Sequence, residues 1–260
     1  MSREKDTIYY HYTSVQACHS ILTRKSVWLT DYRFLNDEQE LNSAINLLGQ
    51  YCSAEQKAAL LAAMHWNNFS HFQCILSLSR SPKILSQWRA YGADGRGMAL
   101  GLRGWALKKV GFELVECKYD NHKEYASEVY KQHQPFLDEL TRTYKELAAN
   151  NFMSWVTGRQ EEMGRIIRDL VPIKNGAFSE EQEVRALVSV PYQEIQLRAR
   201  GDLLVPYIER SLVPSDDTWP LSIIFGEVWL GPKCDDRNRT GLWAAFKDIH
   251  KVERYDCGYV

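Results

Sequence analysis

The sequence of 260 residues lacks any apolar run long enough to span a bilayer, and its charged N-terminus leads into Ile8 without a signal-peptide pattern. It also lacks an excess of charge of either sign, because 32 Lys and Arg residues balance 33 Asp and Glu residues. We therefore expect a cytoplasmic protein with no membrane partner, and no binding of nucleic acid through overall charge. The hydrophobic fraction of 45% is enough for a sizeable core.

The six cysteines form no Cys-x-x-Cys pair, and none has a histidine at metal-ligand spacing. This spacing argues against a zinc site, and free thiols are typical of a reducing compartment. The sequence also has no phosphate-loop spacing, dinucleotide fingerprint, His-Glu-x-x-His helix or EF-hand loop. We therefore expect no metal site.

Strand-like and helix-like segments alternate in blocks along the chain. The patterns predict strands over residues 8–12, 27–30, 72–79, 97–102, 112–119, 183–190, 195–197, 204–208 and 223–230. They predict helices from Thr13 or Ser14 to Leu22, from Asn36-Asp37 to Tyr51, and over 53–66, 82–91, 125–170 (two helices, broken near Asn150-Asn151) and 239–249. This order predicts one α+β domain, residues 1–260, with a mostly antiparallel sheet and a helical insertion at about 121–171.

Polar residues on the first and third predicted strands are candidates for ligand binding. His11, Tyr12 and Thr13 lie where a strand meets a helix N-terminus, a place suited to polar ligands. Ser77 and Ser79 share one face of their strand by alternation, where two hydroxyls can hold a sugar or support a carboxylate. A core histidine and strand-end serines are the simpler alternatives.

Trp88 and Tyr91 are three residues apart in a predicted helix, so we expect them to face the same way. Such a pair can stack on a planar ring, although two core aromatics would show the same spacing. Glu181, Glu183 and Arg185 share one face if their strand begins by Glu181. Close carboxylates repel, so this arrangement requires a raised pKa or a compensating cation, for which Arg185 is the candidate.

A cluster of acidic residues around the start of the helix predicted from Asn36-Asp37 has two interpretations. Asp31, Asp37, Glu38 and Glu40 could hold Mg²⁺ in a nuclease. Acidic residues in the first turn of a helix are also favoured by the helix dipole, which explains most of the group without a metal. The nuclease is therefore a lesser alternative.

Taken in order, the motifs resemble a widespread bacterial family catalogued only as a domain of unknown function. The resemblance covers residues 8–232 and is carried by His11-Tyr-Thr-Ser, Trp28-Leu-Thr, Phe34-Leu-Asn-Asp-x-x-Glu40, Ser77-Leu-Ser79, Trp88-x-x-Tyr91-Gly, Gly95-x-Gly97, Phe178 to Arg185 and Gly231-Pro232. The same features are similar to those of ADP-ribosyltransferases of the diphtheria-toxin-like branch.

This second similarity implies a split-sheet core that uses NAD⁺ as a substrate. Glu183 would be the catalytic carboxylate, and Glu181 would orient the target. The NAD⁺-binding residues would be His11, Tyr12, Thr13, Ser77, Ser79, Trp88 and Tyr91. The acceptor would be a macromolecule, either nucleic acid or protein, and the resemblance implies a toxin or phage-defence effector with an antitoxin as a partner.

Two other functions remain open on the same fold. The sequence combines a first-strand histidine with a Ser-x-Ser second strand, a mixture that keeps a non-catalytic nucleotide- or partner-binding module as the alternative. An NAD⁺ glycohydrolase that releases free ADP-ribose is a lesser enzymatic alternative.

Overall fold

A computed structural model of the protein describes residues 7–35, 39–68, 70–215 and 218–259. It confirms an α+β fold with a mostly antiparallel sheet. The strands are β1 (Ile8–Thr13), β2 (Ser26–Asp31), β3 (His71–Ser79), β4 (Met98–Arg103), β5 (Glu113–Glu116), β6 (Glu183–Pro191), β7 (Gln196–Arg200), β8 (Leu203–Ser211), β9 (Phe225–Leu230) and β10 (Val252–Arg254). The α-helices are α1 (Val15–Arg24), α2 (Gln39–Leu48), α3 (Ala54–Asn67), α4 (Leu85–Ala90), α5 (Gly104–Lys109), α6 (His122–Glu146), α7 (Ala149–Thr157), α8 (Gln160–Leu170), α9 (Leu221–Ile224) and α10 (Arg237–Ala245).

The sheet opens beside β3, and this opening positions the candidate site. The strand order is β10-β9-β4-β1-β3-β2-β8-β7, and β6 pairs with both β3 and β5. Along its whole length β3 pairs with β6, so β1 and β2 share its other edge. There β2 pairs at Cys74 and Ile75, whereas β1 pairs through Tyr10 at Ser79. The two strands therefore part beside residues 76–78.

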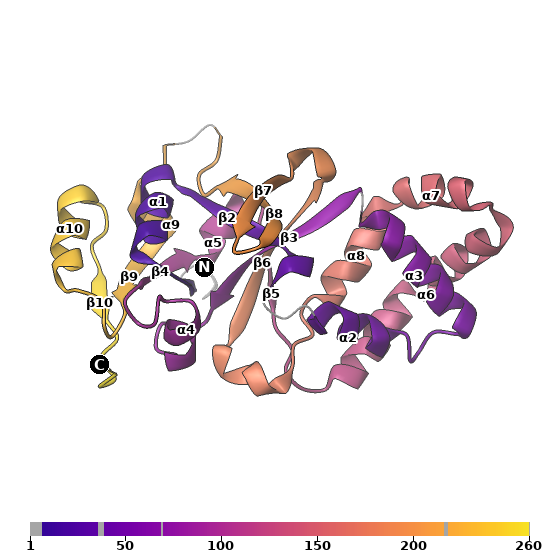
Figure 1. Ribbon diagram of the computed structural model, residues 1–260, viewed down its shortest axis with the longest axis horizontal. Coiled ribbons are helices and arrows are strands. Elements are labelled where there is room, and N and C mark those ends of the chain that lie inside the picture. Colours follow the sequence, from indigo (N-terminus) through magenta and orange to yellow (C-terminus); the bar gives the residue numbers. More distant parts are fainter. Residues whose placement is uncertain (1–6, 36–38, 69, 216–217, 260) are drawn as a thin grey trace.

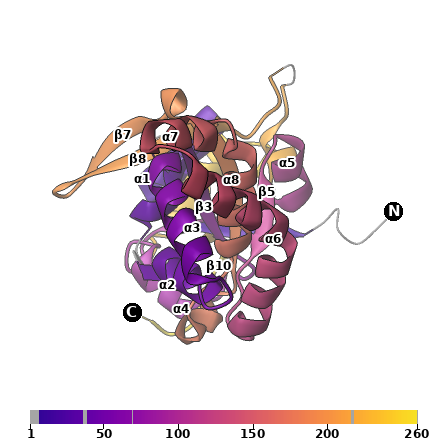
Figure 2. The ribbon, with the colours of Figure 1, turned by 90° about the vertical axis from the view of Figure 1, so that its right-hand side faces the viewer.

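The helices α2, α3, α6, α7 and α8 gather at one end of the molecule, whereas α10 and β10 lie at the opposite end (Figure 1). Apolar side chains of these five helices form one core cluster with Ile75 and Leu187 at the near end of the sheet. A second cluster packs α1, α5 and α9 against the sheet and includes Leu76 and Leu78. Seen from the helical end, the β7–β8 hairpin projects from the side of the molecule (Figure 2).

Several predicted boundaries were wrong. The segment 125–170 contains three helices, because the extended backbone at Leu147 and Ala148 separates α6 from α7, and Gly158-Arg159 separates α7 from α8. The break predicted near Asn150-Asn151 falls in the first turns of α7, where a polar asparagine is tolerated. The last helix spans Arg237–Ala245, not 239–249, and neither α5 nor β10 was predicted.

The predicted N-terminus of the first helix is confirmed, since Ser14 Oγ accepts a hydrogen bond from the Ala17 amide at 3.1 Å. The Asn36-Asp37 cap predicted for the next helix lies outside the described residues. Within the part of the chain that the structure describes, no helix combines the length and apolar character needed to cross a bilayer.

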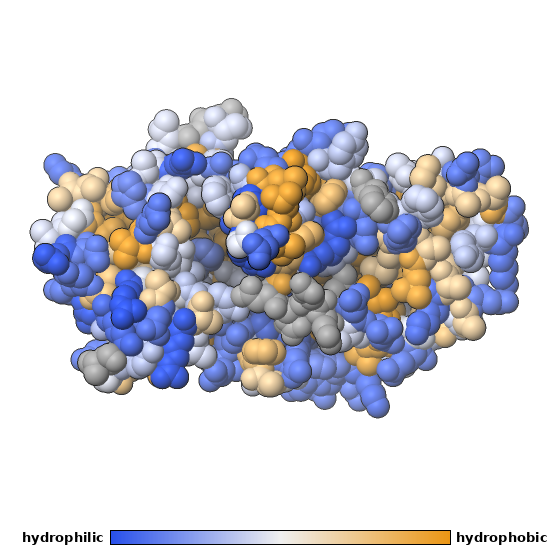
Figure 3. Space-filling model, in the orientation of Figure 1, coloured by the Kyte–Doolittle hydropathy of each residue, from blue (hydrophilic) through white to orange (hydrophobic). Residues whose placement is uncertain are grey.

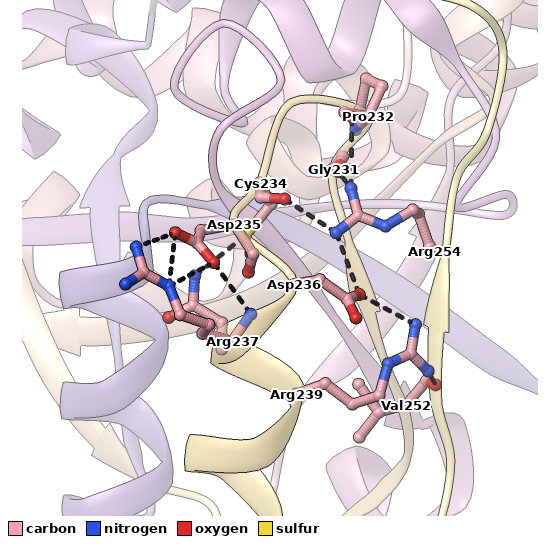
Figure 4. Close-up of polar contacts among 10 residues, drawn as sticks. Gly231, Pro232, Cys234, Asp235, Asp236, Arg237, Arg239, Val252 and Arg254 are labelled. Carbon is pink, nitrogen blue, oxygen red and sulfur yellow. Dashed lines mark hydrogen bonds and ion pairs between the residues drawn. The ribbon is translucent and has the colours of Figure 1, made fainter.

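Glycine motifs close the end of the sheet opposite the helices. A Cβ on Gly92 would lie 2.6 Å from Cε3 of the buried Trp88 ring, and one on Gly231 would lie 2.3 Å from the Gly95 carbonyl oxygen. The guanidinium of Arg254 donates to the carbonyl groups of Gly231 and Pro232 at 3.2 Å and holds this turn against β10 (Figure 4). These motifs therefore serve close backbone packing.

Candidate functional site

A cavity of about 800 Å³ lies where the sheet opens. One wall is formed by β1 and α1, and the other by β2, β7 and β8. The strand β3 contributes mainly apolar side chains, whereas β6 and the segment before it contribute the polar end, formed by Lys174, Glu181, Glu183 and Arg185. Its volume is typical of cavities that bind small molecules and cofactors.

Lys174 joins the two candidate carboxylates at the polar end of the cavity. Its Nζ lies 2.5 Å from Glu181 Oε2 and 2.6 Å from Glu183 Oε2. Arg185 Nε lies 3.1 Å from Glu183 Oε1, so the predicted counter-ion is present as well. All four side chains are buried, and together they carry two negative and two positive charges.

The charges around Glu183 determine its protonation state. Burial alone would raise its pKa, but Arg185 and Lys174 outweigh burial and lower the pKa to about 2. The same carboxylates raise the pKa of Lys174 despite its burial. Glu183 is therefore ionised at neutral pH and suits binding of hydroxyl groups or stabilisation of positive charge, not donation of a proton.

The segment before β6 brings Glu181 to the same lysine by a route that the sequence did not predict. The strand begins at Glu183, not by Glu181, because Glu181 ends a 3₁₀ helix and Gln182 has a φ of 47°. Ser79 Oγ donates to the Glu181 carbonyl at 2.8 Å. The Glu183 amide donates to Tyr119 Oη at 2.7 Å. These bonds position both carboxylates, although only Glu183 and Arg185 share the predicted strand face.

His11 spans the gap between β1 and β3. Its Nδ1 lies 3.1 Å from the carbonyl oxygen of Ser77, and because a carbonyl only accepts, Nδ1 carries the proton of this bond. Burial lowers the pKa of His11, so the ring is neutral at pH 7 and Nε2 is an acceptor. The Ser77 side chain is exposed and lines the cavity with His11, whereas Ser79 is not among the described residues that line it.

The two candidate aromatics separate. The helix α4 ends at Ala90, and Tyr91 leaves the helical backbone with a φ of −120°, so the predicted shared face is wrong. Trp88 is fully buried, its Nε1 donates to the Pro82 carbonyl at 2.9 Å, and it is not among the described residues that line the cavity. Tyr91 lines the cavity and has an exposed fraction of 39%. Only Tyr91 of this pair is therefore placed to contact a ligand there.

Tyr12 and Thr13 also line the cavity, but the Tyr12 hydroxyl is already engaged. It donates to the Ser81 carbonyl at 2.7 Å and accepts from the Ile84 amide at 3.3 Å. Its ring meets the Trp88 ring edge-on, with centroids 4.8 Å apart. Only the ring of Tyr12 is therefore available to contact a ligand, and the same ring packs against the buried Trp88.

The acidic group considered for Mg²⁺ is only partly described. Asp31 is fully buried and accepts three hydrogen bonds from Arg33, which occupy both carboxylate oxygens. Asp37, Glu38 and the side chain of Glu40 lie outside the described residues. Over the described ranges, no cluster of three His, Cys, Asp or Glu side chains is arranged to hold a metal ion.

Other cavity residues were missed in the sequence. Lys174 lies in a loop, where no periodic pattern marked it. Phe178 was quoted only within a motif, yet it is 39% exposed and its ring centroid lies 5.2 Å from Lys174 Nζ. Arg198 and Arg200 also line the cavity, and their Arg-Ala-Arg alternation would have placed both on one strand face.

Comparison with known proteins gives one match. The model of a family described as a protein of unknown function (DUF2971) matches residues 87–186, which is less than half of the chain. The searches of curated proteins and of solved structures found no match. The matched segment runs from α4 into β6 and includes Tyr91, Lys174, Glu181 and Glu183. Over residues 87–186, the chain therefore carries the sequence pattern of this family of unknown function.

Proposed function

We propose that the cavity binds NAD⁺ and that the protein transfers ADP-ribose from it to a macromolecular acceptor, nucleic acid or protein. The observation that carries this proposal is the meeting of His11, Tyr91 and Glu183 at one cavity of about 800 Å³. These residues come from β1, the end of α4 and the start of β6. The residues that resemble an NAD⁺ site by their order in the sequence thus also line the same cavity.

In the proposed reaction, the bond between the nicotinamide nitrogen and the ribose carbon breaks, and nicotinamide leaves with the electron pair. A nucleophilic atom of the acceptor forms the new bond to that carbon and loses its proton to solvent. Positive charge develops on the ribose, so a fixed carboxylate nearby lowers the barrier. Glu183 supplies an ionised carboxylate, His11 Nε2 accepts from a hydroxyl, and Tyr91 stacks on a ring.

The direct test measures nicotinamide release and transfer of label from NAD⁺ in the presence of lysate, RNA or DNA. We expect Glu183→Gln to lower the rate by about 100- to 1000-fold, the usual effect of removing a group that stabilises charge in the transition state. Glu180→Gln is the matched control, because Glu180 is an exposed carboxylate in the same segment. Equal rates in the two variants, or no turnover by the wild type, would contradict the proposal.

The same assay separates the enzymatic alternatives. Free ADP-ribose as the main product would indicate an NAD⁺ glycohydrolase. For a toxin or phage-defence effector, we expect expression to inhibit bacterial growth and Glu183→Gln to relieve the inhibition. An antitoxin partner would relieve it without any change in the protein.

A non-catalytic binding module is the second candidate, and the pairing of Glu183 favours it. Arg185 and Lys174 already donate to its oxygens, so their positive charges largely offset the negative charge of the ionised carboxylate. Calorimetry that detects binding of NAD⁺ or ADP-ribose without nicotinamide release would support this function over transfer.

A further inference from the structure

Arg198 is a half-buried cation in the wall of the cavity, and it has no carboxylate partner among the described residues. Its Nη2 donates to Thr30 Oγ1 at 2.8 Å, and its guanidinium lies 5.3 Å from the Trp28 ring centroid. Its Nε is buried and has no hydrogen-bond partner among the described residues. Arg198 also forms no ion pair with any described residue. A buried N–H donor without an acceptor is unfavourable unless a ligand supplies the acceptor.

The hairpin that carries Arg198 is inverted relative to an ordinary surface hairpin. Arg198 and Arg200 alternate on β7 and both line the cavity. Leu197, on the other face of β7, and its neighbour Leu204 on β8 are 61% and 62% exposed. Figure 3 shows this apolar patch over the hairpin. The leucines thus face solvent while both arginines face the cavity, an orientation that points to a ligand with negative charge.

The surroundings of the two arginines set the chemistry of that ligand. Arg200 Nη2 donates to the carbonyl of Phe34, another lining residue, at 3.2 Å, which fixes the second guanidinium at the cavity. Burial and the charge of Arg200 lower the pKa of Arg198, as expected for two cations held close together. Glu209 is the carboxylate in the same wall, and its Oε1 accepts from Ser26 at 2.5 Å. Paired guanidinium groups match the oxygens of phosphate groups.

We propose that Arg198 and Arg200 form a diphosphate subsite of the cavity, which takes the diphosphate of a dinucleotide or nucleoside diphosphate. This inference deepens the proposed function, on which it rests for NAD⁺ as the ligand. Trp28, 43% exposed beside Arg198, offers an adjacent aromatic surface for the attached base. The phosphates would thus lie against β7, whereas Glu181 and Glu183 reach the cavity from the start of β6 and the segment before it.

Calorimetric titration of the full chain with ADP, adenosine and inorganic pyrophosphate tests the subsite. We expect ADP to bind more tightly than adenosine, and Arg198→Gln to weaken ADP and pyrophosphate binding by about 10- to 100-fold, since hydrogen bonds to charged groups are lost. Adenosine binding should not change. The matched control is Arg210→Gln, because Arg210 lies on β8 in an ion pair with Glu194 and is not among the described lining residues.

Folding of the variant can be checked independently, because removal of an incompletely bonded cation should leave the apo protein at least as stable as the wild type. Equal ADP affinities of the Arg198→Gln and Arg210→Gln variants would overturn the subsite, as would adenosine binding to the wild type as tightly as ADP. Binding of ADP that depends on Arg198, with no nicotinamide release from NAD⁺, would support the subsite while the proposed transfer fails. The two proposals therefore fail separately.

Discussion

Lys174 Nζ lies 2.6 Å from Glu183 Oε2, and this ion pair joins a loop residue to the first residue of β6. It keeps Glu183 ionised inside the protein and at the same time offsets its charge. Whether the cavity catalyses or only binds depends on how a ligand changes this pairing. Variants of these residues separate their structural role from their role toward a ligand.

Removal of the lysine should destabilise the protein. Lys174→Met leaves Glu181 and Glu183 buried with Arg185 alone, and loss of one partner from a buried ion pair typically costs about 3–5 kcal/mol. Urea unfolding at pH 7 measures the change. Lys118→Met is the matched control, because Lys118 is exposed and forms no ion pair with a described residue. Equal unfolding midpoints would contradict the assigned role of Lys174.

Stability should fall in acid because of Glu183. Its pKa is lowered from 4.5 to about 2 on folding, so its contribution is complete above the unfolded value and is lost as the pH falls through the folded value. The window is therefore pH 4.5 down to 2, and the size is about 3 kcal/mol. Urea unfolding across this window should show a shallower pH dependence for Glu183→Gln than for the wild type. If the unfolding free energies of the two proteins changed in parallel with pH, the titration of Glu183 would not be the cause of the loss of stability.

Trp88 and Tyr91 should separate in their effects. Trp88 is fully buried, so Trp88→Ala should cost about 3–5 kcal/mol in unfolding free energy. Tyr91→Ala should change stability by about 0.5 kcal/mol or less, because its side chain is exposed at the cavity. In calorimetry we expect Tyr91→Ala to weaken NAD⁺ binding. The reverse pattern would mean that Tyr91 is the packing residue.

Two glycines should respond to alanine with opposite sign. A Cβ on Gly231 would lie 2.3 Å from the Gly95 carbonyl oxygen, so Gly231→Ala should destabilise by about 1–3 kcal/mol. Gly241 lies inside α10 with open space at its Cβ position, and Gly241→Ala should stabilise by about 0.5–1 kcal/mol. Thermal unfolding of both variants measures the difference. Stabilisation by Gly231→Ala would show that the backbone contact between Gly231 and Gly95 can widen at little cost.

Much of the sheet was predictable because strand periodicity is local. The alternation of Ser77 and Ser79 with Leu76 and Leu78 placed the polar face of β3 correctly. The start of β6 at Glu183 also matches the prediction. The position of Glu181 was not predictable, because it depends on distant partners: Ser79 holds the Glu181 carbonyl, and Tyr119 holds the Glu183 amide.

The sequence by itself determined the α+β class and singled out His11, Tyr91, Glu181 and Glu183, since residue type and spacing are properties of the chain. Only the tertiary structure decided that Trp88 belongs to the core, that Lys174 joins the carboxylates, and that Arg198 faces the cavity. Those outcomes depend on which strands part and which loops meet. Burial and charge pairing arise between segments distant in sequence, and no local pattern records them.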